Sequence, residues 1–343
     1  MGLLHSLPFH LFYSSPAQHD LIVIFYWDIL TCFLAFYIYT NIYNLIWMNT
    51  MAHRDSTHKE KHPKFFVSKF WEVKTEEIDY ILRVIMECFG RLAPHEVALV
   101  DLYVFERSSS LDAFTAKEYE EVGVASAPFD ELFFAMHDAW RGTSRIILCL
   151  ERMKKLLKLV QVGGIRHEVG HSVLHGSLRY YILSLPPAFL DLAVHFDISS
   201  QYATNLLYLI SIAVKDYEVS RLLYERGYVE DQIAYAKHLL TVTKSDILSW
   251  ELSRGKPLAE ILCMVSCLKA AGCAVPFLFN KTFGEEMKKR VMESLSYLPE
   301  GYSAPLLNTI RKGFSSLKAD TLSNIDQMAF LVEEKIVKPL LLK

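Results

Sequence analysis

The sequence predicts an α+β fold that is mostly helical, and three observations lead to this prediction. Two short runs in the first half, 97–106 and 145–150, are rich in β-branched, aliphatic and aromatic residues, as strands are. From residue 176 onward, apolar residues recur at three- and four-residue steps in one segment after another, which is typical of helices. The length of 343 residues and the 52% hydrophobic content leave ample material for a buried core.

Residues 1–55 form a hydrophobic N-terminal segment with the start of a linker. The run 21–48 is almost entirely apolar, and its charge-free part, 29–48, is about long enough to cross a bilayer as a helix. Lys and Arg residues follow it, so the positive-inside rule predicts a single-pass membrane protein whose bulk lies in the cytoplasm. Two alternatives stay open: a long buried helix, or a soluble cytoplasmic chain that truly begins at Met51.

The charge and cysteine content narrow the possible partners. The 36 basic and 39 acidic residues nearly balance, so we expect no nucleic-acid partner. The six cysteines are scattered through apolar runs without a Cys-x-x-Cys pair, which predicts neither a disulfide framework nor a cysteine zinc site. Free cysteines agree with a reducing compartment.

The remaining elements follow in order along the chain. A polar linker covers 56–64 and a helix covers 75–92; a strand at 97–106, a short helix within 107–123, a strand at 145–150 and a helix at 151–160 come next. Later helices are expected at 202–227, 230–241, 244–253, 258–277, 284–295, 306–317 and 324–337. This order divides the chain into the N-terminal segment, a core at 56–240 and a helical C-terminal region at 241–343.

The pattern His-Glu-x-x-His occurs at His167, Glu168 and His171. On a helix the four-residue spacing stacks the two imidazoles on one face, close enough to bind one metal ion, and Glu168 projects beside them. Gly163-Gly164 is interpreted as the start of this helix and Gly176 as its end. The alternative interpretation is a surface helix that happens to carry three histidines.

His175 continues the four-residue series but is not expected to bind the same ion. It would lie about 12 Å along the helix axis from His167, too far for both to share a metal with His171. We expect His175 to border the site or to interact with free carbonyl groups in the last helical turn.

The stretch 214–228, together with His-Glu-x-x-His, resembles the zincin-type metallopeptidases of the gluzincin pattern, and especially the membrane-associated and heat-shock zinc endopeptidases. The resemblance implies a zinc ligand at Asp216, a small apolar position at Val219, a supporting residue at Ser220 and a trailing pair at Gly227-Tyr228. Asp replaces the usual Glu, which shortens the ligand and requires the two helices to approach more closely. Gly170 in the first helix is compatible with that approach.

Glu218 is the alternative third ligand. It lies two residues from Asp216 and therefore on another helical face, so a regular helix cannot offer both to one ion. We favour Asp216 because its face is mostly apolar and should point inward, whereas Glu218 shares a more polar face. A solvated charge pair with Lys215 or Arg221 is a further possibility for either carboxylate.

The resemblance implies a zinc-dependent peptidase that acts on a peptide or protein substrate. His167, His171 and Asp216 would hold Zn²⁺, Glu168 would be the general base, and the last strand of the small sheet would border the cleft where an extended peptide adds as a strand. The alternative is a non-catalytic zinc-binding or regulatory module on the same zincin-like core. Four residues could donate a hydrogen bond to an oxyanion, and the sequence does not select one of them: Tyr180, Tyr181, His195 and Arg221.

Overall fold

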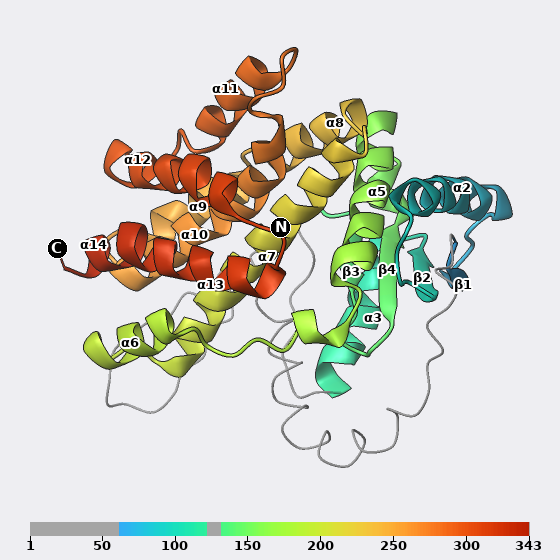
Figure 1. Ribbon diagram of the computed structural model, residues 1–343. Helices are drawn as coiled ribbons and strands as arrows, with labels where there is room; N and C mark the ends of the chain where they lie inside the picture. The colour runs from blue at the N-terminus through green and yellow to red at the C-terminus, as the bar shows by residue number, and fades with distance from the viewer. Residues whose placement is uncertain (1–61, 122–131, 343) are drawn as a thin grey trace, which may run out of the picture.

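The computed structural model describes residues 62–121 and 132–342 and shows the predicted α+β, mostly helical fold (Figure 1). A small sheet with its helices lies on one side, and a larger group of helices lies on the other. Two long helices, α5 (Lys158–His175) and α7 (Ser200–Glu225), pack together where these parts meet. The predicted membrane segment at 21–48 falls outside the described residues.

The sheet has four strands in the order β1-β2-β4-β3. The strands β1 (Lys64–Phe70), β2 (Leu99–Phe105) and β4 (Ser144–Cys149) are parallel, and β3 (Ala135–Asp138) pairs antiparallel with β4 at one edge. Both predicted strands are confirmed. Every residue of β4 is buried, in keeping with the apolar run from Ile146 to Cys149. The edge strands β1 and β3 were not predicted.

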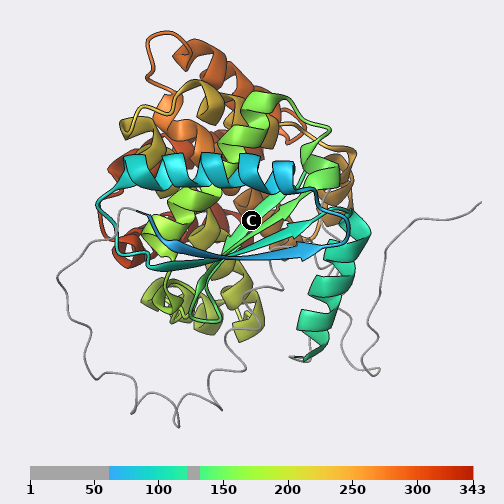
Figure 2. The same cartoon turned by 90° about the vertical axis from the view of Figure 1, so that its right-hand side faces the viewer.

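Helices cover both faces of the sheet (Figure 2). The helix α2 (Thr75–Leu92), with the predicted bounds, packs with α5 on one face, where Leu102 and Ile146 join the same apolar cluster. The helix α3 (Ser108–Glu121) lies on the other face, around Phe105 and Ile147. The sheet is therefore held between helical layers, and α5 is the helix that carries the histidines.

The predicted start of the histidine helix at Gly163-Gly164 is wrong. The short helix α4 (Leu150–Met153) ends early, and α5 begins at Lys158, so both glycines lie inside α5. A Cβ atom on Gly163 would overlap the carbonyl oxygen of Asp231, and one on Gly164 would overlap the ring of Phe134. The two glycines are therefore explained by close packing on neighbouring elements, whereas Gly176 does follow the last helical residue as predicted.

The C-terminal helices form one apolar core around α7, and this core includes residues on both sides of position 240. The helix predicted at 306–317 in fact begins earlier, at Glu300, directly after Pro299. The observed elements are η1 (Leu178–Tyr180), α6 (Pro187–His195), α8 (Glu230–Leu239), α9 (Lys244–Ser253), α10 (Pro257–Ala274), η2 (Val275–Phe277), α11 (Gly284–Ser294), α12 (Glu300–Asn308), η3 (Thr309–Gly313), η4 (Phe314–Ser316), α13 (Thr321–Val332), η5 (Glu333–Val337) and α14 (Lys338–Leu341).

One helical segment among the described residues, 257–277, is long and apolar enough to cross a membrane. Its most apolar window is 67% buried inside the fold, and α10, which forms most of the segment, packs along α7. The burial is that of a core helix, in keeping with the charged Glu260 and Lys269 within the segment.

Candidate metal centre

Three donor atoms from two helices converge in the interior. The Nε2 atoms of His167 and His171, on α5, lie 3.2 Å apart. The Oδ1 atom of Asp216, on α7, lies 3.6 Å from the first and 2.9 Å from the second. Of the sequence-predicted ligands, the structure thus brings His167, His171 and Asp216 together.

The spacing and protonation of these donors fit a small divalent cation. Zinc bonds of about 2.0–2.1 Å in a tetrahedron put neighbouring ligand atoms about 3.3 Å apart, close to the separations observed. Burial lowers the pKa of His171 to about 3, so its imidazole is neutral at pH 7. Burial acts to raise the pKa of Asp216, but its contacts with His167 and His171 prevail and hold that pKa well below its ordinary value. Histidine nitrogens beside a carboxylate are a donor set that zinc takes.

The short Asp216 side chain reaches the histidines because α5 and α7 lie unusually close. A Cβ atom on Gly170 would stand only 2.6 Å from Cγ1 of Val219, so no larger residue fits there. The close approach that the Asp-for-Glu difference requires is therefore present, and Gly170 permits it.

Replacing Gly170 by alanine should destabilise the protein even though alanine favours helices. The new Cβ would press on Val219, and overpacking of this kind typically costs about 1–3 kcal/mol, more than the roughly 1 kcal/mol that alanine gains over glycine in a helix. The free energy of unfolding, measured in urea, should therefore fall. In the double variant with Val219→Ala the loss should shrink.

Gly301 provides the matched control for this substitution. It lies in α12 with open space around its Cβ position, so Gly301→Ala should be neutral or stabilising. A Gly170→Ala protein as stable as the Gly301→Ala protein would contradict the close approach of α5 and α7.

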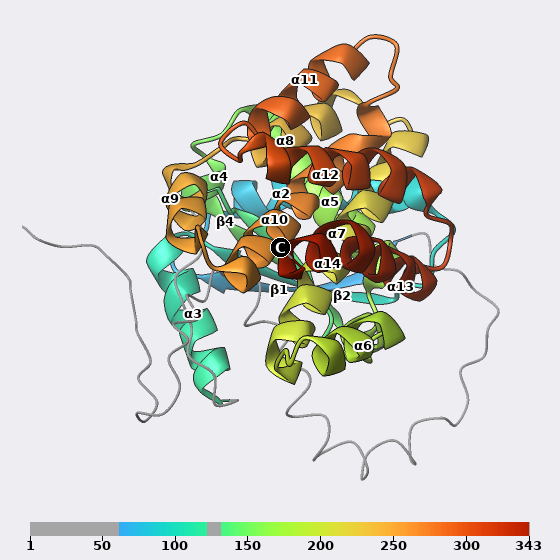
Figure 3. The ribbon, with the colours of Figure 1, turned by 90° about the vertical axis from the view of Figure 1, so that its left-hand side faces the viewer.

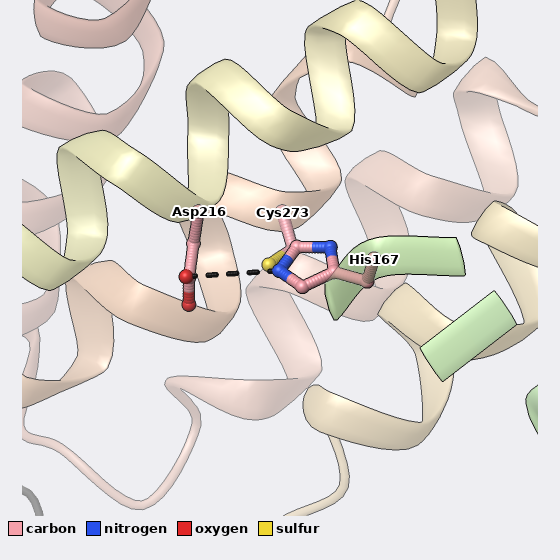
Figure 4. Close-up of side chains that lie close together, drawn as sticks. All are labelled: His167, Asp216 and Cys273. Carbon is pink, nitrogen blue, oxygen red and sulfur yellow. Dashed lines mark ion pairs between the residues drawn. The ribbon is translucent and has the colours of Figure 1, made fainter. Parts of the chain in front are cut away.

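A fourth potential donor, Cys273 on α10, was missed in the sequence. One ligand atom from each of His167, Asp216 and Cys273 lies within 4.8 Å of the other two. The three side chains point toward each other from three helices (Figure 4). Burial, with the charge of Asp216, raises the pKa of the Cys273 thiol well above its ordinary value. Ser220, the predicted supporting residue, is hydrogen-bonded to this thiol.

Glu168 lies inside the protein with 5% of its surface exposed. Its charge is among those that raise the pKa of the Cys273 thiol, so its carboxylate acts on the same interior region. It is not one of the three donors that converge, which are His167, His171 and Asp216.

The expectation that Glu218 lies on a more solvent-exposed face of its helix is wrong. The helix α7 is buried on nearly all sides because α5, α10 and α13 pack around it, and Glu218 is only 4% exposed. Its Oε2 atom lies 3.0 Å from Nε2 of His175, and neither Asp216 nor Glu218 is a solvated charge. Burial raises the pKa of Glu218, while hydrogen bonds from Asn324 and Thr321 act against the shift. His175 borders the site, as expected, and is fully buried.

Two polar residues flank His171 from the side of the sheet. The ring of His137, on the edge strand β3, stacks on the ring of His171 at 5.9 Å between centroids. Tyr181 has its hydroxyl 3.1 Å from Nδ1 of His137. His137 was missed because β3 is short and its sequence is mixed. Tyr181 is thus the oxyanion candidate whose hydroxyl contacts His137, the ring that stacks on His171.

The other oxyanion candidates have contacts of different kinds. Tyr180 packs the edge of its ring against His175 at 5.2 Å. His195 is exposed on α6 and bonds to the Asp191 carbonyl, and Arg221 donates to two carbonyl groups that precede α13.

The trailing pair Gly227-Tyr228 has a structural role in this fold. Gly227 has φ = +82°, a conformation that favours glycine, just beyond the end of α7. The hydroxyl of Tyr228 donates to Glu87 at 2.9 Å, and the guanidinium of Arg166 lies 4.3 Å from its ring centroid. The pair thus ties the end of α7 to α2 and α5.

Comparison of the chain with protein-family models, with curated proteins and with solved structures found no match.

Proposed function

We propose that this protein is a zinc-dependent peptidase. The observation that carries the proposal is the convergence of His167, His171 and Asp216 on one point, with separations that suit zinc, beside the glutamate of a His-Glu-x-x-His helix. A surface helix that carried histidines by chance would not bury them against a carboxylate from another helix. His167, for example, is 2% exposed.

Each residue has a definite task in this proposal. His167, His171 and Asp216 would hold the ion, and a bound zinc would supply a Lewis acid that brings the pKa of a coordinated water toward neutrality. The Glu168 carboxylate would accept a proton from the attacking water and later pass it to the leaving amine. His137 and Tyr181, beside His171, are the candidates to donate a hydrogen bond to the developing oxyanion.

In this proposal, an extended peptide substrate binds along the edge of β3. This strand is at the edge of the described sheet and packs against α5. The sequence had suggested the strand at 145–150, but β4 is enclosed between β2 and β3. A peptide in extended form could therefore add only next to β3 on this side of the sheet, with its backbone close to the histidine helix.

The proposal is tested with zinc-loaded protein and a mixed-sequence peptide library analysed by mass spectrometry. We expect cleavage products that depend on zinc and that disappear in the Glu168→Gln variant. Peptides that stay intact with the zinc-loaded wild type would contradict the peptidase assignment.

A second candidate function, a closed zinc site without catalysis, is favoured by Cys273. If the thiolate binds together with two histidines and an aspartate, the ion has four protein ligands, as structural zinc sites do, and no position is left for water. The protein would then be a zinc-binding or regulatory module.

Co²⁺ can take the place of Zn²⁺ and, unlike Zn²⁺, gives a visible absorption spectrum. This spectrum can distinguish the two candidate functions. For the peptidase we expect Co²⁺ to bind without a sulfur-to-cobalt charge-transfer band, and Cys273→Ser to leave the spectrum and the metal affinity nearly unchanged. For the closed site, the wild type should show the band and Cys273→Ser should lose it. Cys149 is a buried cysteine of β4, and Figure 1 shows β4 and α10 on opposite sides of the molecule, so Cys149→Ser is the matched control.

A further inference from the structure

The strand β1 and the residue that follows it expose large apolar side chains. Phe66 is 64% exposed and Trp71 is 65% exposed, whereas β4 in the same sheet is buried throughout. β1 has a neighbouring strand on one side only among the described residues, and it carries two exposed lysines, Lys64 and Lys69, but no acidic residue. We call these four residues the β1 edge.

The β1 edge lies away from the larger group of helices. Figure 1 shows β1 on the outer side of the sheet. Figure 3, seen from the left-hand side of Figure 1, shows the C-terminal helices α13 and α14 in front and the sheet behind them. The exposed rings of Phe66 and Trp71 are therefore not part of the contact between the sheet and the C-terminal helices.

Trp71 is held in a backbone conformation that tryptophan rarely adopts. Its φ angle is +76°, in the left-handed region that favours glycine. The guanidinium of Arg107 lies 5.4 Å from the ring centroid, but the side chain stays largely exposed, so burial in the core does not compensate for the unfavourable backbone. The indole is therefore suited to a contact outside the fold.

β1 follows the predicted membrane segment closely along the chain. Residues 49–63 separate the apolar run 21–48 from Lys64, and a chain of this length spans at most about 50 Å even when fully extended. With 21–48 in a bilayer, β1 is the described element that the chain tethers most closely to the membrane surface. Tryptophan and phenylalanine favour the membrane interface, and lysines are attracted to anionic lipids.

We propose that the β1 edge binds the surface of an anionic lipid bilayer, with Phe66 and Trp71 among the headgroups and the two lysines beside lipid phosphates. The inference rests on the predicted membrane segment and not on the proposed metal site. The opposite edge strand, β3, is three strand spacings away, about 14 Å. The contact would thus turn the β3 edge, next to the histidine helix, away from the membrane and toward peptides in the aqueous phase.

The full chain in nanodiscs of phosphatidylcholine and phosphatidylserine tests this contact. Bromine atoms on the lipid chains quench tryptophan fluorescence at short range, and iodide quenches tryptophans that are open to water. The share of the signal that comes from Trp71 is the difference between the wild type and Trp71→Phe. We expect this share to be quenched by brominated lipid and shielded from iodide.

Trp140 provides the matched control. It lies in the turn between β3 and β4, at the other edge of the sheet, and the guanidinium of Arg141 lies 4.6 Å from its ring centroid, much as Arg107 lies beside Trp71. The share of the signal that Trp140→Phe removes should be independent of lipid bromination.

A second pair of variants tests the apolar contact itself. Phe66→Ser should remove about half of the bromine quenching of Trp71, because binding at a membrane interface scales with the apolar area that is buried. Phe279 is the matched control: it is 80% exposed, and Nζ of Lys288 lies 5.9 Å from its ring centroid, but it lies between η2 and α11. Phe279→Ser should leave the quenching of Trp71 unchanged.

Three results would overturn the inference. The first is a Trp71 share that brominated lipid does not quench and that iodide does. The second is shielding from iodide without quenching by bromine, which would assign the β1 edge to a protein contact such as a second copy of the chain. The third is a full chain that does not associate with the nanodiscs. The measurement needs neither zinc nor peptide, so its outcome is separate from that of the proposed function.

Discussion

Replacing Glu168 by glutamine should lower kcat/KM for peptide hydrolysis by about 10²- to 10⁴-fold, the usual contribution of a general base. The amide has the same shape as the carboxylate but cannot take a proton from the attacking water. The zinc content should not change, because Glu168 is not among the three donors that converge. Initial rates on a cleaved peptide, together with elemental analysis of the same samples, measure both quantities.

Glu76 offers a matched control for this experiment. It is an exposed glutamate in the first turn of α2 and is not among the converging donors, so Glu76→Gln should keep full activity. A Glu168→Gln protein that folds, binds zinc and cleaves peptides at the wild-type rate would rule out the assigned base. A loss of zinc together with the loss of activity would instead place Glu168 among the metal ligands.

The parts of the fold and site that sequence predicts well depend on local periodicity. The helix 75–92, the two inner strands and the inward histidine pair all follow from spacing along one element. Asp216 was preferred over Glu218 because of the apolar stripe on its own helix, but both carboxylates are buried, so this stripe does not by itself separate them. The glycine at 170 added a tertiary requirement, since a shorter ligand needs closer helices.

The features that the sequence does not predict depend on contacts with other helices and strands. Gly163 and Gly164 were interpreted as a helix start because glycine often ends helices, yet here they make room for Asp231 and Phe134. Cys273 lies in an apolar helix that packs along α7, and no sequence spacing links it to His167. Glu218 was expected to be exposed to solvent. In the structure α13 covers it and supplies two hydrogen-bond donors, and the pattern of α7 alone does not predict this contact.

Replacing Asp216 by alanine should remove the zinc. The two histidines would keep their places on α5, but two imidazole donors 3.2 Å apart hold a cation far less well than the same two donors with a carboxylate. The zinc affinity should fall by more than about 100-fold, because the loss of a ligand has a larger effect than the loss of a ligand's hydrogen-bond partner. Zinc per chain after dialysis, and competition with a chromophoric chelator, measure this loss.

Two further variants separate the ligand role of Asp216 from a general effect of charge. Asp79→Ala removes an exposed carboxylate from α2 and should keep its zinc. Asp216→Glu keeps the charge but adds a methylene between helices whose distance is fixed by the contact of Gly170 with Val219, so it too should bind zinc more weakly than the wild type. If Asp216→Ala retained one zinc per chain, the carboxylate would not be a ligand, and the metal would have to be held by His167 and His171 with Cys273 in its place.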